Sequence, residues 1–274
     1  MQKGLYFLLM IIGFYGCSRK TLQTDWVKAN LKGNVMSVKE YSYKAVVKFG
    51  EVEKGGPGEL NIDQTFNKDG YLIEVNDYLN GTLFQKTKYS YSNDHKLERV
   101  ELYNSAGGLQ VLQKFEYTDS KTVLSRSYNA EGALLMSHRE LIDKAGNIIE
   151  YSDSIPTSPY SSQLNLPSVV KQQFNSNNQI TAITRYNTQN EIISEEKNKY
   201  DGGVLIEKWI SDGFTIKYTN DKIGNQIEAI SQGSQGTTTL KTSYKYDSHQ
   251  NWIEKTVLFN GEPHQITQRI IEYY

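Results

Sequence analysis

The chain alternates polar residues with aromatic or aliphatic ones over short stretches, and clusters of turn-forming residues separate these stretches. Segments such as QKTKYSY, KFEY and KTSYKY have a period of two, which is expected of a strand with one buried face. The clusters are rich in Asn, Asp, Ser and Gly, which allow the backbone to reverse direction within a few residues. The pattern predicts many narrow antiparallel strands joined by tight turns.

One phrase recurs along the chain: an aromatic residue, an Asn- or Asp-containing turn and then an aliphatic residue. Copies include FNKDGYLIE from Phe66, YNSAGGLQV from Tyr103 and YDSHQNWIE from Tyr246. Most successive copies begin roughly 11 to 14 residues apart, a spacing at which short strands and turns alternate. The repeats predict an all-β fold, a long antiparallel meander of tandem hairpins that forms a curled, open sheet. An open sheet would have two edge strands available for pairing.

Two segments interrupt the repeats. FGEVEKGGPGEL, from Phe49 to Leu60, predicts a Gly-rich excursion within the first hairpin, and residues 152–168 hold three of the five prolines. Proline is rare in central strands, so residues 152–168 predict a long loop or a linker. The phrases resume after this segment, which favours one continuous sheet, and two separate sheets are the alternative. Helical periodicity is confined to Leu22–Leu31, with Thr24 or Asp25 as the N-cap.

The first residues predict an export signal. Lys3 precedes an apolar run from Leu5 to Tyr15 that is too short to span a bilayer, so residues 1–16 are interpreted as a signal peptide. Cys17 follows at once, and FYGC resembles the lipobox of bacterial lipoproteins, in which the cysteine is lipidated and becomes the new N-terminus. This resemblance implies a lipid anchor on Cys17, with residues 17–30 as a tether and short N-terminal segment. A plain signal peptide or an uncleaved anchor is the alternative.

Composition excludes several classes of function. The net charge is -1 and the isoelectric point is about 6.5, so the chain has no basic excess with which to bind nucleic acid. A single cysteine excludes disulfides within the chain. The 20 tyrosines far outnumber the 9 phenylalanines and 3 tryptophans, which fits narrow strands whose surfaces are half exposed to water.

The histidines and the Asp- and Asn-rich turns are the candidates for catalytic or metal-binding chemistry. The four histidines are His95, His138, His249 and His264, and none has the paired spacing of a metal site. His95 and His249 fall in matching turns, which favours a role as polar turn residues. Stretches such as FNKDG invite a calcium interpretation, but turn formation explains the same residues better. We therefore expect no catalytic residue, metal or cofactor, and no enzymatic activity.

The tandem units, together with YDSHQNWIE, resemble the Rhs/YD-repeat family. The segments LKGNVMSVKEYSY and ITQRIIEYY are similar to those of anchored repeat proteins from Bacteroides-type bacteria. The resemblance covers most of residues 31–274, which we take as one repeat domain. It implies a long antiparallel meander that curls, and a role in binding carbohydrate or a cell surface.

These observations predict a lipoprotein of the cell envelope, held at the outer membrane by its lipid, that acts as a non-catalytic binding or scaffolding module. The expected partner is a glycan or another envelope protein, and the oligomeric state is left open. Trp209 and Trp252 are the candidate ligand-binding residues, unless their rings simply belong to the core. Two rival functions are a hydrolase that uses Asp201, Asp212 or Asp247, and an accessory subunit of an envelope transporter or secretion system.

Overall fold

The computed structural model describes residues 24–154 and 168–274, which form 18 strands and one short helix. The helix is α1 (Asp25–Lys28). The strands are β1 (Val35–Lys48), β2 (Glu51–Phe66), β3 (Leu72–Leu79), β4 (Thr82–Tyr91), β5 (Leu97–Asn104), β6 (Leu109–Tyr117), β7 (Thr122–Asn129), β8 (Leu134–Ile142), β9 (Ile148–Ser154), β10 (Val169–Phe174), β11 (Ile180–Tyr186), β12 (Ile192–Asp201), β13 (Val204–Ile210), β14 (Phe214–Asn220), β15 (Gln226–Gly233), β16 (Gly236–Tyr246), β17 (Trp252–Phe259) and β18 (Glu262–Tyr273). The predicted all-β antiparallel meander is confirmed.

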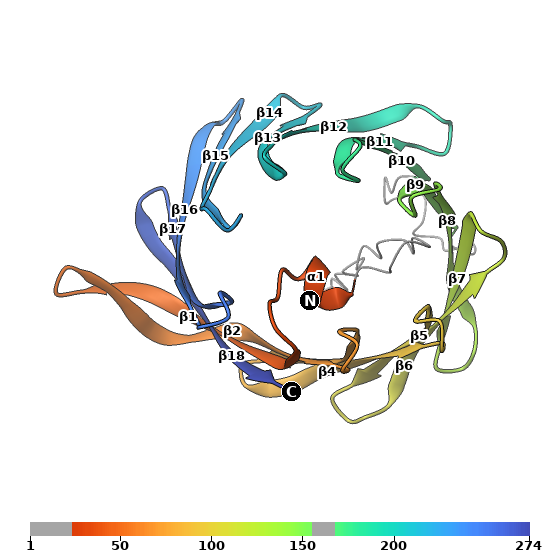
Figure 1. The fold of residues 1–274 in the computed structure, drawn as a ribbon, viewed down its shortest axis with the longest axis horizontal. Coiled ribbons are helices and arrows are strands. Elements are labelled where there is room, and N and C mark those ends of the chain that lie inside the picture. The colour runs from red at the N-terminus through yellow and green to blue at the C-terminus, as the bar shows by residue number, and fades with distance from the viewer. Residues whose placement is uncertain (1–23, 155–167) are drawn as a thin grey trace, which may run out of the picture.

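The meander closes into a barrel. Each strand pairs antiparallel with the next along the chain, and β1 also pairs with β18, where Val38 lies opposite Ile271 (Figure 1). The prediction of an open sheet was therefore wrong, because the two terminal strands satisfy each other's backbone groups. The prediction of one continuous sheet was right, since β9 and β10 pair across the Pro-rich segment, with Tyr151 opposite Val170.

The Asn or Asp of the repeated phrase closes its turn. Asn104 Oδ1 accepts hydrogen bonds from the backbone N–H of Ala106 (3.0 Å) and Gly108 (2.9 Å), and Gly107 between them has a φ of 82°. Such a left-handed position favours Gly or Asn. The same pair of bonds recurs at Asn67, Asp143, Asn175, Asn187, Asp221 and Asp247.

A β-bulge accompanies these turns. Tyr103 pairs with Leu109, and the register shifts by one residue beside this pair. Bulges bend a strand and increase its twist, which helps a meander to curve and close. Other aromatic-to-aliphatic pairs with a bulge include Phe66 with Leu72, Tyr91 with Leu97, Tyr128 with Leu134 and Tyr186 with Ile192, and the aromatic pair Tyr246 with Trp252 has one too.

The short helix α1 defines the inner face of the barrel. It begins after Thr24, whose hydroxyl accepts a hydrogen bond from the N–H of Val27, and it lies within the outline of the ring in Figure 1. Trp26 packs against the fully buried Val38 and Phe66. The face of the sheet that carries Val38 is therefore the inner one. Of the described residues, no helix is long and apolar enough to cross a membrane.

Rings at strand ends point inward at one rim and outward at the other. Successive hairpins of a meander lie at opposite rims. A hairpin at one rim is superposed on an identical hairpin at the other by a rotation of 180° about an axis that lies in the sheet, perpendicular to the strands. This rotation turns the sheet over, so a side chain that faces inward at one rim faces outward at the other. At the rim that holds α1, tyrosine hydroxyls donate to backbone carbonyls or turn carboxylates: Tyr91 to Leu72, Tyr117 to Leu97, Tyr200 to Ile180, Tyr246 to Asp221 and Tyr273 to Asp247. At the opposite rim, outward rings carry a lysine above them: Tyr103 with Lys88, Tyr128 with Lys114 and Tyr186 with Lys171.

Two glycines with the same backbone conformation allow a matched test of how α1 is seated. Gly70 (φ 84°) and Gly107 (φ 82°) both have a left-handed backbone conformation, which favours glycine over residues with a Cβ. Alanine at either position should therefore lower the unfolding free energy by about 1 kcal/mol. A Cβ at Gly70 would also lie 2.6 Å from the indole of Trp26, whereas nothing lies within 4 Å of one at Gly107. Urea unfolding should therefore show that Gly70→Ala costs roughly 1 to 3 kcal/mol more than Gly107→Ala. Equal costs would contradict the contact between Trp26 and this turn.

Candidate functional site

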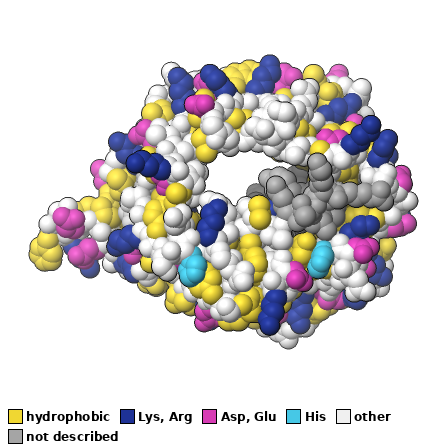
Figure 2. Space-filling model, viewed as in Figure 1, with side chains coloured by type: hydrophobic (Ala, Val, Ile, Leu, Met, Phe, Trp, Pro, Cys, Tyr) yellow, Lys and Arg dark blue, Asp and Glu magenta, His cyan; other side chains and the backbone are white. Residues whose placement is uncertain are grey.

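The outer face of the barrel carries charges along the middle of its strands. Figure 2 shows Lys, Arg, Asp and Glu side chains distributed around the ring. Outward ion pairs include Lys86 with Glu74, Arg99 with Glu101, Arg126 with Glu116, Lys171 with Glu150 and Lys241 with Glu228. A barrel wall embedded in lipid presents an apolar band outward. The charges indicate that this wall faces water.

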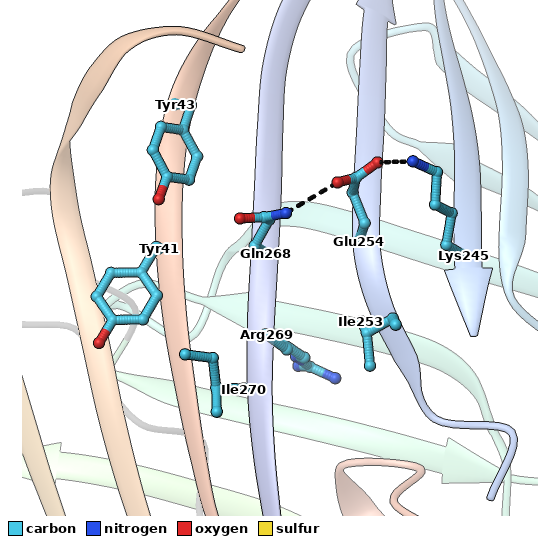
Figure 3. A pocket seen from close by; sticks show the side chains of 8 residues that line it. All are labelled: Tyr41, Tyr43, Lys245, Ile253, Glu254, Gln268, Arg269 and Ile270. Carbon is cyan, nitrogen blue, oxygen red and sulfur yellow. Dashed lines mark hydrogen bonds and ion pairs between the residues drawn. The ribbon is translucent and has the colours of Figure 1, made fainter. Parts of the chain in front are cut away.

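A groove of about 340 Å³ lies on the outer face where the first hairpin leaves the barrel wall (Figure 3). β1 pairs with β18 only as far as Lys44 opposite Gln265, and beyond that point it pairs with β2 alone. The hairpin then projects from the ring, as Figure 1 shows. The predicted Gly-rich excursion is thus part of a paired strand, and a Cβ at Gly55 would lie 2.8 Å from Val46 Cγ1. Glycine allows the two strands to approach closely here.

Two tyrosine rings form one side of the groove. Tyr41 and Tyr43 are two positions apart on β1, so both project from the outer face, and Figure 3 shows them in one row. Tyr41 lies opposite Gln268 of β18. The ammonium group of Lys54 stands 5.2 Å from the centre of the Tyr43 ring and 4.0 Å from Glu254 Oε2. The rings are half-buried, so each still has surface to offer a ligand.

Polar groups form the other side of the groove. Glu254 on β17 accepts a hydrogen bond from Gln268 Nε2 (3.0 Å) and forms an ion pair with Lys245 Nζ (2.6 Å). The hydrogen bond from Lys245, with help from Gln268 and against the effect of burial, holds the pKa of the Glu254 carboxyl below its usual value. The groove therefore combines two rings with an ionised carboxylate, an amide and an ammonium group.

An arginine whose side chain is 13% exposed supports the wall behind the groove. Arg269 belongs to the inner face, because it lies opposite Glu40 and two positions from the Val38–Ile271 pair. Its Nε and Nη2 donate to Glu40 Oε1 at 2.8 and 2.6 Å, and its guanidinium carbon lies 3.5 Å from the centre of the Trp252 ring. Burial lowers the pKa of Arg269, although Glu40 opposes this shift. This stack fixes β18 between β1 and β17.

The two tryptophans proposed as ligand-binding residues lie apart. Trp252 is on β17 and stacks on Arg269 at the inner face, whereas Trp209 is on β13 with Lys197 5.3 Å above its ring. Neither lines the groove, and the structure does not bring them together. Tyr41 and Tyr43 were missed as site residues, although KEYSY places two tyrosines on one face of a strand.

Sequence reasoning also missed a charged network on the inner face. His138 of β8 lies between Asp153 Oδ1 (2.6 Å) and Glu140 Oε1 (3.2 Å), and its ring is 5.5 Å from that of Tyr151. Burial disfavours the charged imidazole, but hydrogen bonds and charges from Asp153 and Glu140 prevail and raise the pKa of His138 to about 9. The alternation of His138 with Glu140 on one strand face could have indicated half of this network. Asp153 was assigned to the Pro-rich segment, but the structure places it in β9, which ends at Ser154.

The remaining candidates are dispersed. Asp201 ends β12, Asp212 lies in the turn at the opposite end of β13, and Asp247 closes its own turn by accepting from the N–H of His249. The three acids proposed for a hydrolase are thus not gathered into one site. His95 and His249 are turn residues as predicted, and their rings stack on tyrosines. No group of His, Cys, Asp and Glu suited to a metal occurs among residues 24–154 and 168–274.

Some predictions fall on residues that the structure does not describe. The signal peptide at 1–16, the lipidation site Cys17 and Leu22 of the predicted helix lie outside the described residues, as does most of the Pro-rich segment. The tether at 17–30 is described only from Thr24 onward, where it includes α1. The lipid anchor therefore stays a prediction.

Comparison with known proteins adds little about function. No family model matches the chain and no curated protein matches its sequence, so membership of the Rhs/YD-repeat family stays a prediction. Among solved structures, a porin-like protein from Bacteroides uniformis is 10% identical with a TM-score of 0.45, over 88% of this chain and 98% of that one. Structures of TcdB2-TccC3-TEV and TcdB2-TccC3 are 13% and 12% identical with TM-scores of 0.28, over 78% and 77% of this chain and 15% of theirs.

The His138 network predicts a pH-dependent stability. The folded pKa of about 9 lies above the usual value of 6.5, so the network stabilises the fold fully below pH 6.5 and loses this effect as the pH rises through 9. An NMR titration of His138 should therefore have its midpoint near pH 9, and His138→Gln should flatten the fall in unfolding free energy between pH 6.5 and 9. A midpoint near 6.5 would contradict the pairing with Asp153.

Proposed function

We propose that this protein is a non-catalytic, carbohydrate-binding module of the bacterial cell envelope. The observation that carries the proposal is the groove where Tyr41 and Tyr43 stand in a row beside Gln268, Glu254 and Lys245 (Figure 3). Tyrosine rings offer flat apolar surfaces with a polar tip, which suits the mixed apolar and hydroxyl-bearing faces of sugar rings. The amide, carboxylate and ammonium groups can bind sugar hydroxyls at the edge of the stack.

The chemistry of the groove supports binding without hydrolysis. Most glycosidases need two carboxyl groups on either side of the bond that they cleave, one of them protonated. Among the residues that line this groove, Glu254 alone carries a carboxylate, and its lowered pKa keeps it ionised. A single ionised carboxylate is suited to accepting hydrogen bonds from hydroxyls.

The charged outer wall supports a place beside a membrane and not within it. A barrel whose outward strand positions form ion pairs is stable in water, so we propose that a lipid on Cys17 tethers it to the outer membrane. The sequence around Cys17 and the apolar run before it support this anchor.

Radiolabelled palmitate should enter the wild-type chain in a bacterial host and not the Cys17→Ser variant, and equal labelling would contradict the anchor.

The groove can be tested on a glycan array with the purified full-length protein. Tyr41→Ala and Tyr43→Ala should each weaken binding to the glycans that the wild type retains by about tenfold, because each removes one stacking surface. Tyr186→Ala is the matched control, since Tyr186 is also an outward ring with a lysine above it but lies on β11, outside the groove.

The outcomes separate the proposal from its rivals. Binding that falls with Tyr41→Ala and Tyr43→Ala, and persists in Tyr186→Ala, supports the module. Release of sugars from the retained glycans would show catalysis and contradict a purely binding role. Absence of binding to every glycan would favour an accessory subunit of an envelope assembly, and loss of binding in all three variants alike would contradict the assignment of the groove.

A further inference from the structure

A second hollow on the outer wall, far from the groove along the chain, combines two arginines with several serines. It has a volume of about 250 Å³ and spans β7, β8 and β9. The strand register places Arg126 opposite Ser137, and Ser137 opposite Ser154. In the adjoining row Arg139 lies opposite Ser152. The short serine side chains leave space between the two longer arginines.

Among residues 24–154 and 168–274, Arg139 has no carboxylate partner. The described residues contain five arginines, and the other four form ion pairs or charge-assisted hydrogen bonds with a glutamate: Arg99 with Glu101, Arg126 with Glu116, Arg185 with Glu196 and Arg269 with Glu40. The sequences of segments 1–23 and 155–167 contain no Asp or Glu. Arg139 is exposed, so its guanidinium group is accessible from the hollow.

The acids nearest in the register are already occupied. Glu116 lies 3.0 Å from Arg126, and Glu150, two positions from Ser152 on β9, lies 3.7 Å from Lys171 Nζ. A guanidinium group stays protonated at any physiological pH. The hollow therefore has a surplus positive charge at Arg139, and serine hydroxyls beside it that can donate hydrogen bonds.

We propose that this hollow binds an oxyanion carried by an acidic sugar: a sulfate ester, a phosphate ester or a carboxylate. Guanidinium groups bind such oxyanions through paired N–H donors, and such charge-assisted bonds are stronger than neutral ones. Nucleic acid is a poor alternative, because a phosphate backbone needs a stripe of basic residues and the chain has a net charge of -1. The site lies on β7–β9 and the tyrosine groove on β1 and β16–β18, so the oxyanion site stands apart from the groove, whereas the choice of a sugar as its carrier rests on the proposed function.

Binding can be measured by isothermal titration calorimetry on the purified full-length protein at low salt. The probes are glucose 6-sulfate, glucose 6-phosphate and glucuronate, with glucose as the neutral reference and sodium sulfate as the free anion. At least one acidic sugar should bind, and Arg139→Gln should weaken that binding about tenfold or more, as expected for the loss of a charge-assisted hydrogen bond. Added salt should also weaken the binding of the acidic sugar to the wild-type protein.

Arg99→Gln is the matched control. It removes the same charge from the same outer wall, on β5, outside the hollow, and should change the affinity by less than about twofold, since the interaction between exposed charges in water weakens with distance. Equal weakening by Arg99→Gln and Arg139→Gln, no effect of Arg139→Gln, or no binding of any acidic sugar would each overturn the proposal. Sodium sulfate that binds as tightly as the sugar esters would overturn the assignment to an acidic sugar. Circular dichroism of each variant shows whether the fold is retained.

Discussion

The hydrogen-bonded ladder between the first and last strands is the constraint on which the structure depends. An open meander leaves two rows of backbone N–H and C=O groups without partners, and such edges recruit other chains. Pairing β1 with β18 removes both edges. On the inner side the same ladder brings Ile271 against Val38 and the cluster around Trp26, and on the outer side it places Gln268 beside Tyr41. Core and groove therefore both require closure.

We call the β1–β18 ladder the seam. Away from it, hydrogen bonds within each repeat and between neighbouring repeats hold the barrel wall together. Each Asn or Asp closes its own turn, and the tyrosine of one repeat donates to a carbonyl or carboxylate of the repeat before it, as Tyr246 does to Asp221. Identical hairpins at the two rims present opposite faces of the sheet to the interior. The same repeated sequence therefore gives inward tyrosines that hydrogen-bond through their hydroxyls at one rim, and outward tyrosines with a lysine above the ring at the other. The abundance of tyrosine thus serves the two rims in different ways. The two proposed binding sites lie where the repeat is broken, at the Gly-rich first hairpin and at the serine-rich rows of β8 and β9.

The sequence predicted what each repeat does locally, and it could not predict what joins distant repeats. The geometry of a turn residue such as Asp221 can be predicted from the sequence, because the backbone N–H groups that it binds lie only two and four residues further along the chain. Closure depends on the number of strands and on their accumulated curvature, which a single repeat does not specify. Trp209 and Trp252 were singled out because tryptophan is rare in this sequence. The tyrosine groove instead depends on the pairing of β1 with β18, which places Tyr41 opposite Gln268. The pairing of His138 with Asp153 was hidden because a Pro-rich segment follows Asp153 directly.

An engineered disulfide across the seam tests closure most directly. Lys39 of β1 lies opposite Ile270 of β18, so Lys39→Cys with Ile270→Cys, in a Cys17→Ser background, should form an intramolecular disulfide under mild oxidation. Non-reducing electrophoresis should show a compact monomer, and the control pair Lys39→Cys with Thr184→Cys of β11 should stay reduced. If Lys39→Cys with Ile270→Cys stays reduced, or joins only separate chains, the barrel is open and the account fails.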